Sequence, residues 1–498
     1  MSTNINFVNS LGLGSNTRVD FNLPRTILLK GEGRAVASSL GVAEAELCSY
    51  NTLNGLNYLA LLRSASLIVT PNSYNEGTLF SVIPLNGNGD FTVTRATKAR
   101  RTNSIGLIES VANNVPRLDY SLGSCPNLLL EPQRTNLALY SEEFENASWT
   151  KGNSTITANS IISPSGVQNA DTFNEGTTTN VHSIINFFSI SSGVNNTFSV
   201  YIKKGTSSYI RISIADNTLS TIWVSAQFNL DTLTFTSGVG IAGGTFISAS
   251  IVSANNGWYR CILVGNIPIT GVGMCIISSS NGVAITSADS RGRATYTGIS
   301  NTFYLWGAQL EAGAYATSYI PTTTASVTRN ADLITRDNVY TNGLISASGG
   351  TWFVELRNNI DRVRDIGGPG LALSDITSGT ITALSLRNFT QRLTISKYIT
   401  GAPTTLYTTT TDIIKVAFKW NGTTADVFVN GTKVVSATAF TTTALEWIIN
   451  PSPVDVPKNI NQMALWATPL TDDQLELLTG DSFNTYAEMA SFYNYTLQ

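Results

Sequence analysis

Short runs in which apolar and polar residues alternate recur through the middle of the chain, separated by Gly, Asn, Asp and Ser. The runs are NTFSVYIKKG (196–205), YIRISIADN (209–217), TIWVSAQFNL (221–230), TLTFTSG (232–238), GWYRCILVG (257–265), GMCIISSSNG (273–282) and NTFYLWGAQLEAG (301–313). Strand-like runs at this spacing predict a β-sandwich or barrel. The alternation in 196–204 and 208–216 predicts strands that are buried on one face only.

The C-terminal third carries the clearest local signals. KVAFKW-NG-TTADVFV-NG-TKVVSATAF (415–440) predicts a three-stranded meander with Asn-Gly turns at 421–422 and 430–431, because a type I′ turn needs positive φ at both central residues. PLTDDQLELLTG (469–480) predicts a short helix capped by Thr471 and Gln474 and stopped by Gly480. A second capping box, Thr485 with Glu488, predicts a terminal helix.

The first 125 residues are mixed in pattern. Segments 36–47 and 53–63 favour short helices interrupted by glycine, and 78–95 reads as strand, turn and strand. The 498 residues therefore divide into 1–125, a mixed α/β docking or collar region, 126–326, a β-sandwich, and 327–498, a second β-sandwich. The fold class predicted is mainly β, with two tandem antiparallel sandwiches of jelly-roll type.

Composition supports a β protein and narrows the partners. Only 13% of residues are charged, against about 25% in ordinary domains, and uncharged polar residues and glycine replace them. A net charge of −3 gives no support for nucleic-acid binding. One basic stretch contains Arg95, Lys98, Arg100 and Arg101. It is interpreted as a solvated loop or as ion-pair partners within an assembly, with phosphate binding as the alternative.

No apolar run is long enough to cross a bilayer, and the N-terminus lacks a secretory pattern. The four cysteines (Cys48, Cys125, Cys261 and Cys275) have no spacing typical of zinc or disulfides. Cys261 and Cys275 lie in apolar strands and are expected to be buried free thiols. The chain is therefore expected to be made and assembled in a reducing cytoplasm, with no membrane insertion.

Candidate catalytic chemistry is sparse. His182, the single histidine, is expected to be a structural side chain, since no G-x-S-x-G motif accompanies it. GVGIAG (238–243) has the letters of a dinucleotide motif but strand-like segments on both sides, so it predicts a glycine-rich turn. Carboxylates that could form a glycosidase pair are Glu131, Glu142, Glu143 and Glu145, with Asp361 and Asp365 interleaved with Arg362 and Arg364. Structural roles are expected for all of them.

Carbohydrate recognition uses exposed aromatic rings, and the chain offers eight tryptophans. They are Trp149, Trp223, Trp258, Trp306, Trp352, Trp420, Trp447 and Trp466. Core packing is the expectation for each, and Trp420, placed just before a turn, is the one expected to be most exposed. No catalytic, cofactor or metal residue is predicted, no cofactor is expected, and the glycan-binding residues stay unassigned.

Two motifs resemble the two ends of a carbohydrate-binding-like β-sandwich that recurs in phage tail and fibre proteins. The opening motif is LLLEPQRTNLALYSEEFENASWTK (128–151) and the closing motif is WGAQLEAGAYATSYIPTT (306–324). The C-terminal third, with TWFVELR (351–357), VFVNGTKV and LTDDQLELLTG, resembles the concanavalin-like or laminin-G-like jelly rolls of phage and bacterial surface proteins.

These resemblances imply a non-enzymatic virion protein, a fibre or appendage on the tail or head. They further imply docking to other virion proteins through the N-terminal region, homotrimer formation, and a bacterial surface glycan as ligand. Two alternatives stay open: an architectural decoration protein without glycan binding, and a polysaccharide depolymerase, because jelly rolls host enzymes as well as lectins.

Overall fold

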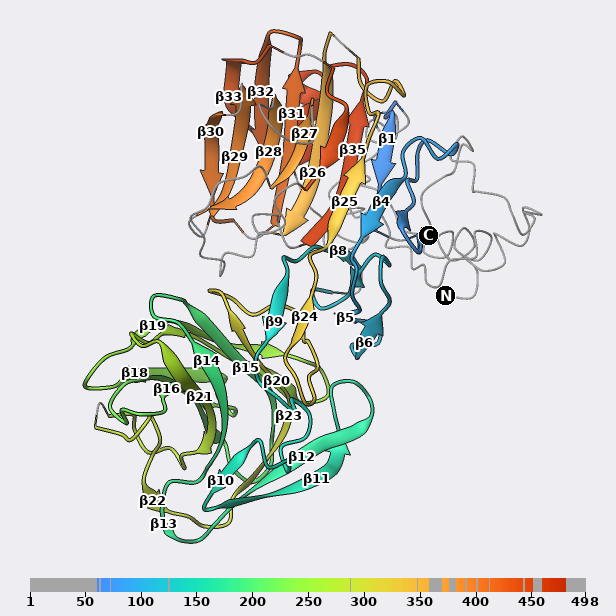
Figure 1. The fold of residues 1–498 in the computed structure, drawn as a ribbon. Coiled ribbons are helices and arrows are strands. Elements are labelled where there is room, and N and C mark those ends of the chain that lie inside the picture. The colour runs from blue at the N-terminus through green and yellow to red at the C-terminus, as the bar shows by residue number, and fades with distance from the viewer. Residues whose placement is uncertain are drawn as a thin grey trace, which may run out of the picture. The chain divides into compact units, whose positions relative to one another are not determined.

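The computed structural model shows a mainly β protein (Figure 1). The structure describes residues 61–480 except 62–63, 72, 124–125, 287, 347, 358–369, 376–381, 390–391, 400–401, 412, 442–443 and 451–458. The helices expected at 36–47 and after Thr485 lie outside these residues, as does 53–63 apart from Leu61.

The chain forms two compact units, and both are discontinuous in sequence. Unit 1 contains residues up to 98, 111–132 and 331 onward, whereas unit 2 contains 99–110 and 133–330. The ranges expected from sequence were each continuous. They differ from these units because strand pairing, not chain order, decides which segments share a core.

Unit 1 consists of two antiparallel sheets that enclose one hydrophobic core, to which Phe91, Trp352 and Ile448 contribute. The first sheet runs β33 (Thr432–Ala439), β32 (Thr424–Val429), β31 (Ile413–Trp420), β26 (Gly350–Arg357), β35 (Asn459–Trp466), β8 (Asn127–Leu129) and β7 (Leu118–Asp119), with β1 (Leu67–Val69) also on β35. The second runs β2 (Tyr74–Asn75), β3 (Thr78–Leu79), β4 (Phe91–Thr94), β25 (Leu333–Arg336), β34 (Trp447–Ile449), β27 (Leu371–Ser374), β28 (Ala383–Phe389), β29 (Arg392–Ile399) and β30 (Ala402–Thr409). The strand pair expected within 78–95 is confirmed as β3 and β4.

The predicted meander is confirmed as β31, β32 and β33, but its two turns differ. At the second turn, Asn430 and Gly431 have φ of 47° and 80°, as a type I′ turn requires. At the first turn only Gly422 has positive φ. There the Asn421 side-chain oxygen accepts from the backbone N–H of Thr424 at 2.9 Å, so the expectation of a type I′ turn was wrong at this position.

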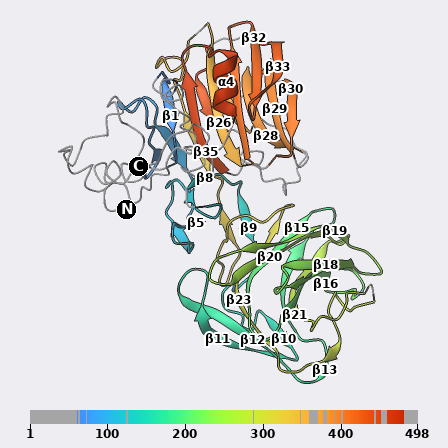
Figure 2. The ribbon, with the colours of Figure 1, turned by 180° about the vertical axis from the view of Figure 1, so that it is seen from behind.

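The helix α4 (Asp472–Thr479) forms as predicted, and Figure 2 shows it against the first sheet of unit 1. Thr471 and Gln474 form the capping box, and Gly480 ends the helix by donating its N–H to the Glu476 carbonyl. Leu475 and Leu478 are buried against the outer face of the sheet, in a cluster with Phe353 and Phe428.

Unit 2 has two six-stranded antiparallel sheets that enclose a second core, to which Phe198, Ile212 and Leu305 contribute. One sheet runs β10 (Thr150–Gly152), β14 (Ser183–Ile190), β21 (Gly271–Ser279), β16 (Tyr209–Asp216), β17 (Trp223–Asn229) and β18 (Thr234–Val239). The other runs β11 (Ser154–Ile162), β12 (Gln168–Glu175), β23 (Thr302–Ala312), β15 (Asn196–Lys204), β20 (Trp258–Asn266) and β19 (Thr245–Ser253). Short pairs are β5 (Ala99–Thr102) with β6 (Ile108–Val111), β9 (Arg134–Asn136) with β24 (Val327–Arg329), and β13 (Thr179–Asn180) with β22 (Tyr296–Thr297).

Each strand-like run quoted from 196–313 forms a strand, but the expected burial was wrong. β15 and β16 are buried along nearly their whole length on both faces. The outer face of β15 carries Tyr201, which packs with Trp306, Tyr319 and Ile108 of the β6 strand. The outer face of β16 lies under the 280–298 loop. Segments distant in sequence therefore cover faces that alternation alone assigns to solvent.

Candidate functional site

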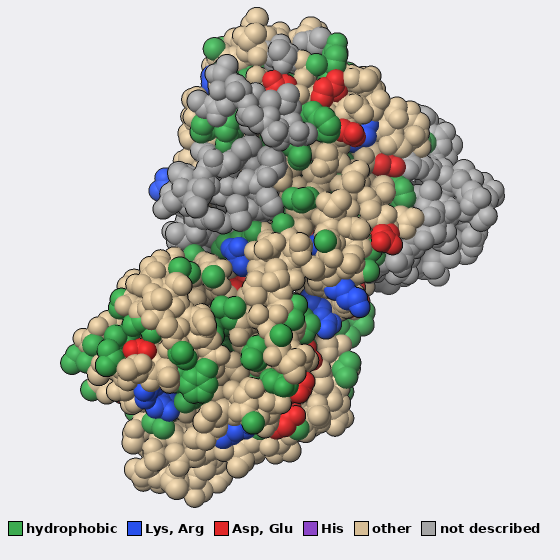
Figure 3. All heavy atoms as spheres, in the orientation of Figure 1, with side chains coloured by type: hydrophobic (Ala, Val, Ile, Leu, Met, Phe, Trp, Pro, Cys, Tyr) green, Lys and Arg blue, Asp and Glu red, His purple; other side chains and the backbone are tan. Residues whose placement is uncertain are grey.

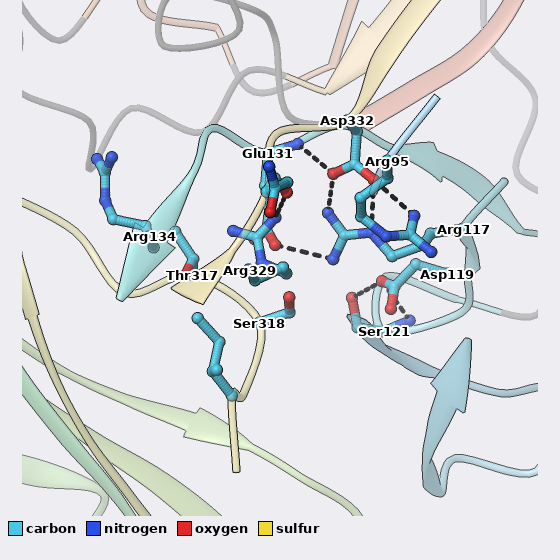
Figure 4. A network of polar contacts seen from close by, with 12 residues as sticks. Arg95, Arg117, Asp119, Ser121, Glu131, Arg134, Thr317, Ser318, Arg329 and Asp332 are labelled. Atoms are coloured by element: carbon cyan, nitrogen blue, oxygen red, sulfur yellow. Dashed lines mark hydrogen bonds and ion pairs between the residues drawn. The ribbon is translucent and has the colours of Figure 1, made fainter. Parts of the chain in front are cut away.

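Four charged side chains form a buried network in unit 1 (Figure 4). Arg95 donates to the Asp332 carboxylate at 2.8 Å, and Arg117 also binds Asp332. Arg117 donates in addition to Glu131 at 2.9 Å. The side chains are 0–2% exposed, so these ion pairs lie out of contact with water.

Burial changes the pKa values of the two arginines. Burial lowers the pKa of Arg95 although Asp332 opposes the shift. Burial acts in the same direction on Arg117, but Asp332 and Glu131 together raise the pKa of Arg117 above its ordinary value. Because the Arg95 guanidinium is buried and bound to a carboxylate, it is not available to an external phosphate. The role is that of an ion-pair partner.

Other cations of the basic stretch differ in their surroundings. Arg101 pairs with Glu109 at 2.7 Å across the hairpin of β5 and β6, whereas Lys98 is exposed. Arg95 and Arg101 each pair with a carboxylate, which supports the interpretation of these two as ion-pair partners. Figure 3 shows the same scarcity of charge, since few acidic and basic side chains appear on a face formed mostly by the backbone and other side chains.

The opening and closing motifs meet in unit 2. The Asn136 amide donates to the carbonyls of Ala308 and Ile320 at 3.0 and 2.8 Å. The Ser141 hydroxyl lies 2.7 Å from that of Tyr319. These contacts fasten the beginning of unit 2 to its end, which gives both motifs a role in closing the fold.

The carboxylates of the opening motif have different surroundings. Glu131 belongs to the buried network of unit 1, and Glu142 accepts from the Asn169 amide at 2.8 Å in unit 2. Burial raises the pKa of Glu142. Glu143 is half-buried and Glu145 is exposed. Asp361 and Asp365 lie outside the described residues.

A carboxylate pair that sequence reasoning missed involves Asp171, which is 1% exposed. Burial raises the pKa of Asp171 to about 7, and the neighbouring Glu145 carboxylate adds to the shift. The two oxygens of Asp171 accept main-chain N–H groups of Phe144 and Asn159, each at 2.9 Å. Asp171 therefore orders the loop of the opening motif.

His182 is buried and lies beside Tyr296. Its Nδ1 is 2.8 Å from the Asn153 carbonyl, which accepts a hydrogen bond from it, while Nε2 has no hydrogen-bond partner. GVGIAG connects β18 to β19, as expected for a glycine-rich turn between strands. A Cβ at Gly240 would lie 2.0 Å from the Thr221 carbonyl, so close backbone approach explains the glycine.

Seven tryptophans are less than 2% exposed, and Trp447 on β34 is half-buried. Core packing is thus confirmed for Trp420, whose ring packs across Gly350, where a Cβ would lie 2.6 Å from it. Only its expected rank was wrong, because Trp447 and not Trp420 is the most exposed of the eight. Cys261 and Cys275 are free and buried as predicted, and burial raises the pKa of the Cys275 thiol to about 12. Cys48 and Cys125 lie outside the described residues.

A second feature without a sequence signature is the loop 280–298 of unit 2. Arg211 on β16 holds it by donating to Asp289 at 2.7 Å, while its Nε donates to Gln227 of the neighbouring strand β17, also at 2.7 Å. The tip of the loop is a tight turn in which Arg291 and Gly292 have φ of 56° and 70°. A Cβ at Gly292 would lie 2.7 Å from the Cβ of Ser225, so only glycine lets the turn rest on the sheet.

The turn places two arginines differently. Arg291 donates to the main-chain carbonyls of Asp216 and Asn217 at 3.2 and 2.9 Å. Arg293 makes longer contacts, to the Ser183 hydroxyl at 3.4 Å and to the carbonyl and hydroxyl of Ser290 at 3.2 and 3.5 Å. Among the described residues no carboxylate pairs with Arg293. Burial and the charge of Arg291 lower the pKa of Arg293 to about 10.

In the described part of the chain, no three His, Cys, Asp and Glu side chains gather closely enough to bind a metal ion. None of its helices has the length and apolar character needed to cross a bilayer.

No protein-family model and no curated protein matches this chain. Solved structures that resemble it are sialidases of Trypanosoma rangeli. A mutant with trans-sialidase activity is 9% identical with a TM-score of 0.23, over 62% of this chain and 60% of that one. The complex with sialic acid is 9% identical with a TM-score of 0.23, and that with 2,3-difluorosialic acid is 8% identical with a TM-score of 0.26. Each of these two comparisons covers 82% of this chain and 78% of the other.

These matches are all to enzymes, so the expectation that this protein is not an enzyme is contradicted, and we withdraw it. At this TM-score and identity the likeness carries no argument for sialidase activity or for a shared fold.

Proposed function

We propose that this chain is a structural component of a phage virion, a fibre or appendage that contributes to attachment to the bacterial surface. In this proposal each unit is an antiparallel β-sandwich, the N-terminal region docks to other virion proteins, and the protein assembles as a homotrimer. The ligand is a glycan of the host surface.

The observation that carries the proposal is the meeting of the opening and closing motifs in unit 2. Asn136 and Ser141 of the first motif bind main-chain and side-chain groups of the second, including Tyr319. The motifs on which the resemblance to phage modules rests are thus joined in one closed β unit. The largely uncharged polar surface is compatible with extracellular exposure and with weak glycan contacts that multivalency strengthens.

The test is competition for adsorption. Purified protein, shown by light scattering to have a defined oligomeric state, is added to host cells before the parent phage. We expect dose-dependent inhibition of adsorption, and antibody against the protein should label virions in electron micrographs.

The matched control is the same protein after heat denaturation. Labelled virions without inhibition of adsorption indicate the architectural alternative, a decoration protein. Virions that carry no label contradict the proposal as a whole.

A further inference from the structure

We propose that Arg293, at the tip of the 280–298 loop, is the centre of a binding site for an oxyanion carried by the glycan ligand, foremost the carboxylate of a uronic acid. The inference rests on the proposed attachment function and names the chemical class of its ligand.

The charge of Arg293 is the first reason. Arg95, Arg117 and Arg211 each bind a carboxylate in the same protein. Arg293 is half-buried and pairs with no carboxylate of the described residues, because Asp289, the acid of its own loop, pairs with Arg211. A partly desolvated guanidinium without a counter-charge is costly, and an anionic ligand relieves that cost.

The hydroxyl groups around Arg293 are the second reason. Ser183 and Ser278 face each other on β14 and β21, and Arg293 donates to the Ser183 hydroxyl at 3.4 Å. The Ser278 hydroxyl is buried and has no hydrogen-bond partner. A free hydroxyl at the position paired with Ser183 can supply one more donor to an oxyanion, and the flat fork of the Arg293 guanidinium suits a carboxylate in particular.

The rigidity of the turn is the third reason. Arg291 occupies a left-handed position at which Asn, Asp or Gly is preferred, and its side chain is bound to two carbonyls. Gly292 rests on Ser225. The backbone on both sides of the site is therefore fixed before a ligand arrives, which lowers the entropy cost of binding.

An exposed aromatic ring lies farther along β14, the strand that carries Ser183. Phe187 lies on the same face of β14 as Ser183, four residues on, and is 41% exposed. At the rise of a strand the two positions are about 13 Å apart. A short oligosaccharide that binds Arg293 through one carboxylate can thus place another sugar ring against Phe187.

The experiment is saturation-transfer NMR with the full-length protein and four probes: glucuronate, tri-galacturonate, inorganic phosphate and glucose. We expect millimolar binding of both uronates, tighter for the trimer, and none of glucose, because weak single-site contact is typical of multivalent attachment. Arg293→Gln should weaken uronate binding roughly tenfold or more. Ser278→Ala should weaken it less, and Phe187→Ala should weaken only the trimer.

Lys203→Gln is the matched control, because it removes one positive charge from β15 in the other sheet and should leave binding unchanged. Arg293→Gln should not lower the melting temperature, since it removes an uncompensated charge. A large loss of stability in this variant indicates a structural arginine and overturns the proposal, as does equal binding by wild type and variant. Binding of phosphate but of neither uronate overturns the assignment to a carboxylate.

Failure here is separable from failure of the attachment function. Inhibition of phage adsorption by wild type and Arg293→Gln alike, with no uronate bound, retains the attachment function and removes this site. Uronate binding that depends on Arg293, without inhibition of adsorption, retains this site and removes the attachment function.

Discussion

Asp332 is the central residue of the buried network in unit 1, because it binds both Arg95 and Arg117. Its partners are 237 and 215 positions away in sequence. Buried ion pairs contribute little net stability when complete, but removing one partner leaves an uncompensated charge in the interior.

Asp332→Asn should therefore lower the free energy of unfolding of unit 1 by about 3–5 kcal/mol. Chemical denaturation followed by tryptophan fluorescence measures this change. Asp337→Asn is the control, since Asp337 is 49% exposed and its pair with Arg336 should be worth less than about 1 kcal/mol. Equal effects of the two substitutions contradict a special role for the network.

Asp171 is the residue that should make unit 2 sensitive to pH. Burial raises its pKa to about 7 in the folded protein, from an ordinary value near 3.8. Between these values the folded state binds one more proton than the unfolded state, so stability falls as pH rises from about 4 to 7 and is then constant.

In Asp171→Asn this dependence on pH should be lost. The measurement is the free energy of unfolding at pH 5 and pH 8, with wild type losing roughly 1–3 kcal/mol between them and the variant losing less than half of that. Asp231→Asn is the control, because that exposed carboxylate has its pKa lowered by Lys204 and does not titrate in this range. A variant that keeps the full dependence on pH shows that another group is responsible.

At the scale of elements, α4 is stabilised both by residues within the helix and by contacts with strands distant in sequence. Its capping box satisfies main-chain N–H groups at the start of the helix, and Asp472 in the first turn binds Lys433 at 3.0 Å and also Lys419. Leu475 and Leu478 attach the helix to the sheet.

Thr471→Ala should reduce stability by about 1 kcal/mol, because the N–H of Gln474 loses its acceptor. Hydrogen exchange should show faster opening of α4 than of the neighbouring strand β31. Thr410→Ala, an exposed threonine outside any strand, should change neither quantity. No change in the exchange of α4 in Thr471→Ala shows that packing alone holds the helix.

At the scale of the whole molecule, the chain passes between the two units four times, after residues 98, 110, 132 and 330. Within unit 1, the segments next to the first two crossings lie close together, and so do those next to the last two. The N–H of Asn114 donates to the carbonyl of Arg95, and that of Asp332 to the carbonyl of Glu131, each at 2.9 Å. Three of these four residues also belong to the ionic network.

Unit 1 should consequently fold without unit 2. Replacing 99–110 and 133–330 by short Gly-Ser turns leaves both pairs of crossing points and the network intact, and loop closure over a few residues costs little entropy. Near-UV circular dichroism and thermal melting should show a cooperative transition. The shortened protein with Asp332→Asn should lose this cooperative transition. If the shortened protein without that substitution shows no cooperative transition, unit 1 does not fold independently.

Sequence reasoning found the quoted strands of 196–313, the meander and the capped helix α4, because side-chain period, turn residues and caps act within a few positions of the chain. It did not find β11, β12 and β14, which it left unassigned. For the candidate sites it identified Arg95 and Glu131 as residues of interest, but without their partners.

The sequence by itself therefore determined the β character, many of the strands and the local turns of this protein. Tertiary structure alone decided which strand faces are covered and that Arg95, Arg117, Glu131 and Asp332 share one interior site. It also decided that, among the described residues, no carboxylate pairs with Arg293. The physical reason is that hydrogen-bond period and capping are short-range properties of a chain. Burial and charge balance depend on segments that lie far apart in sequence and meet only in the folded protein.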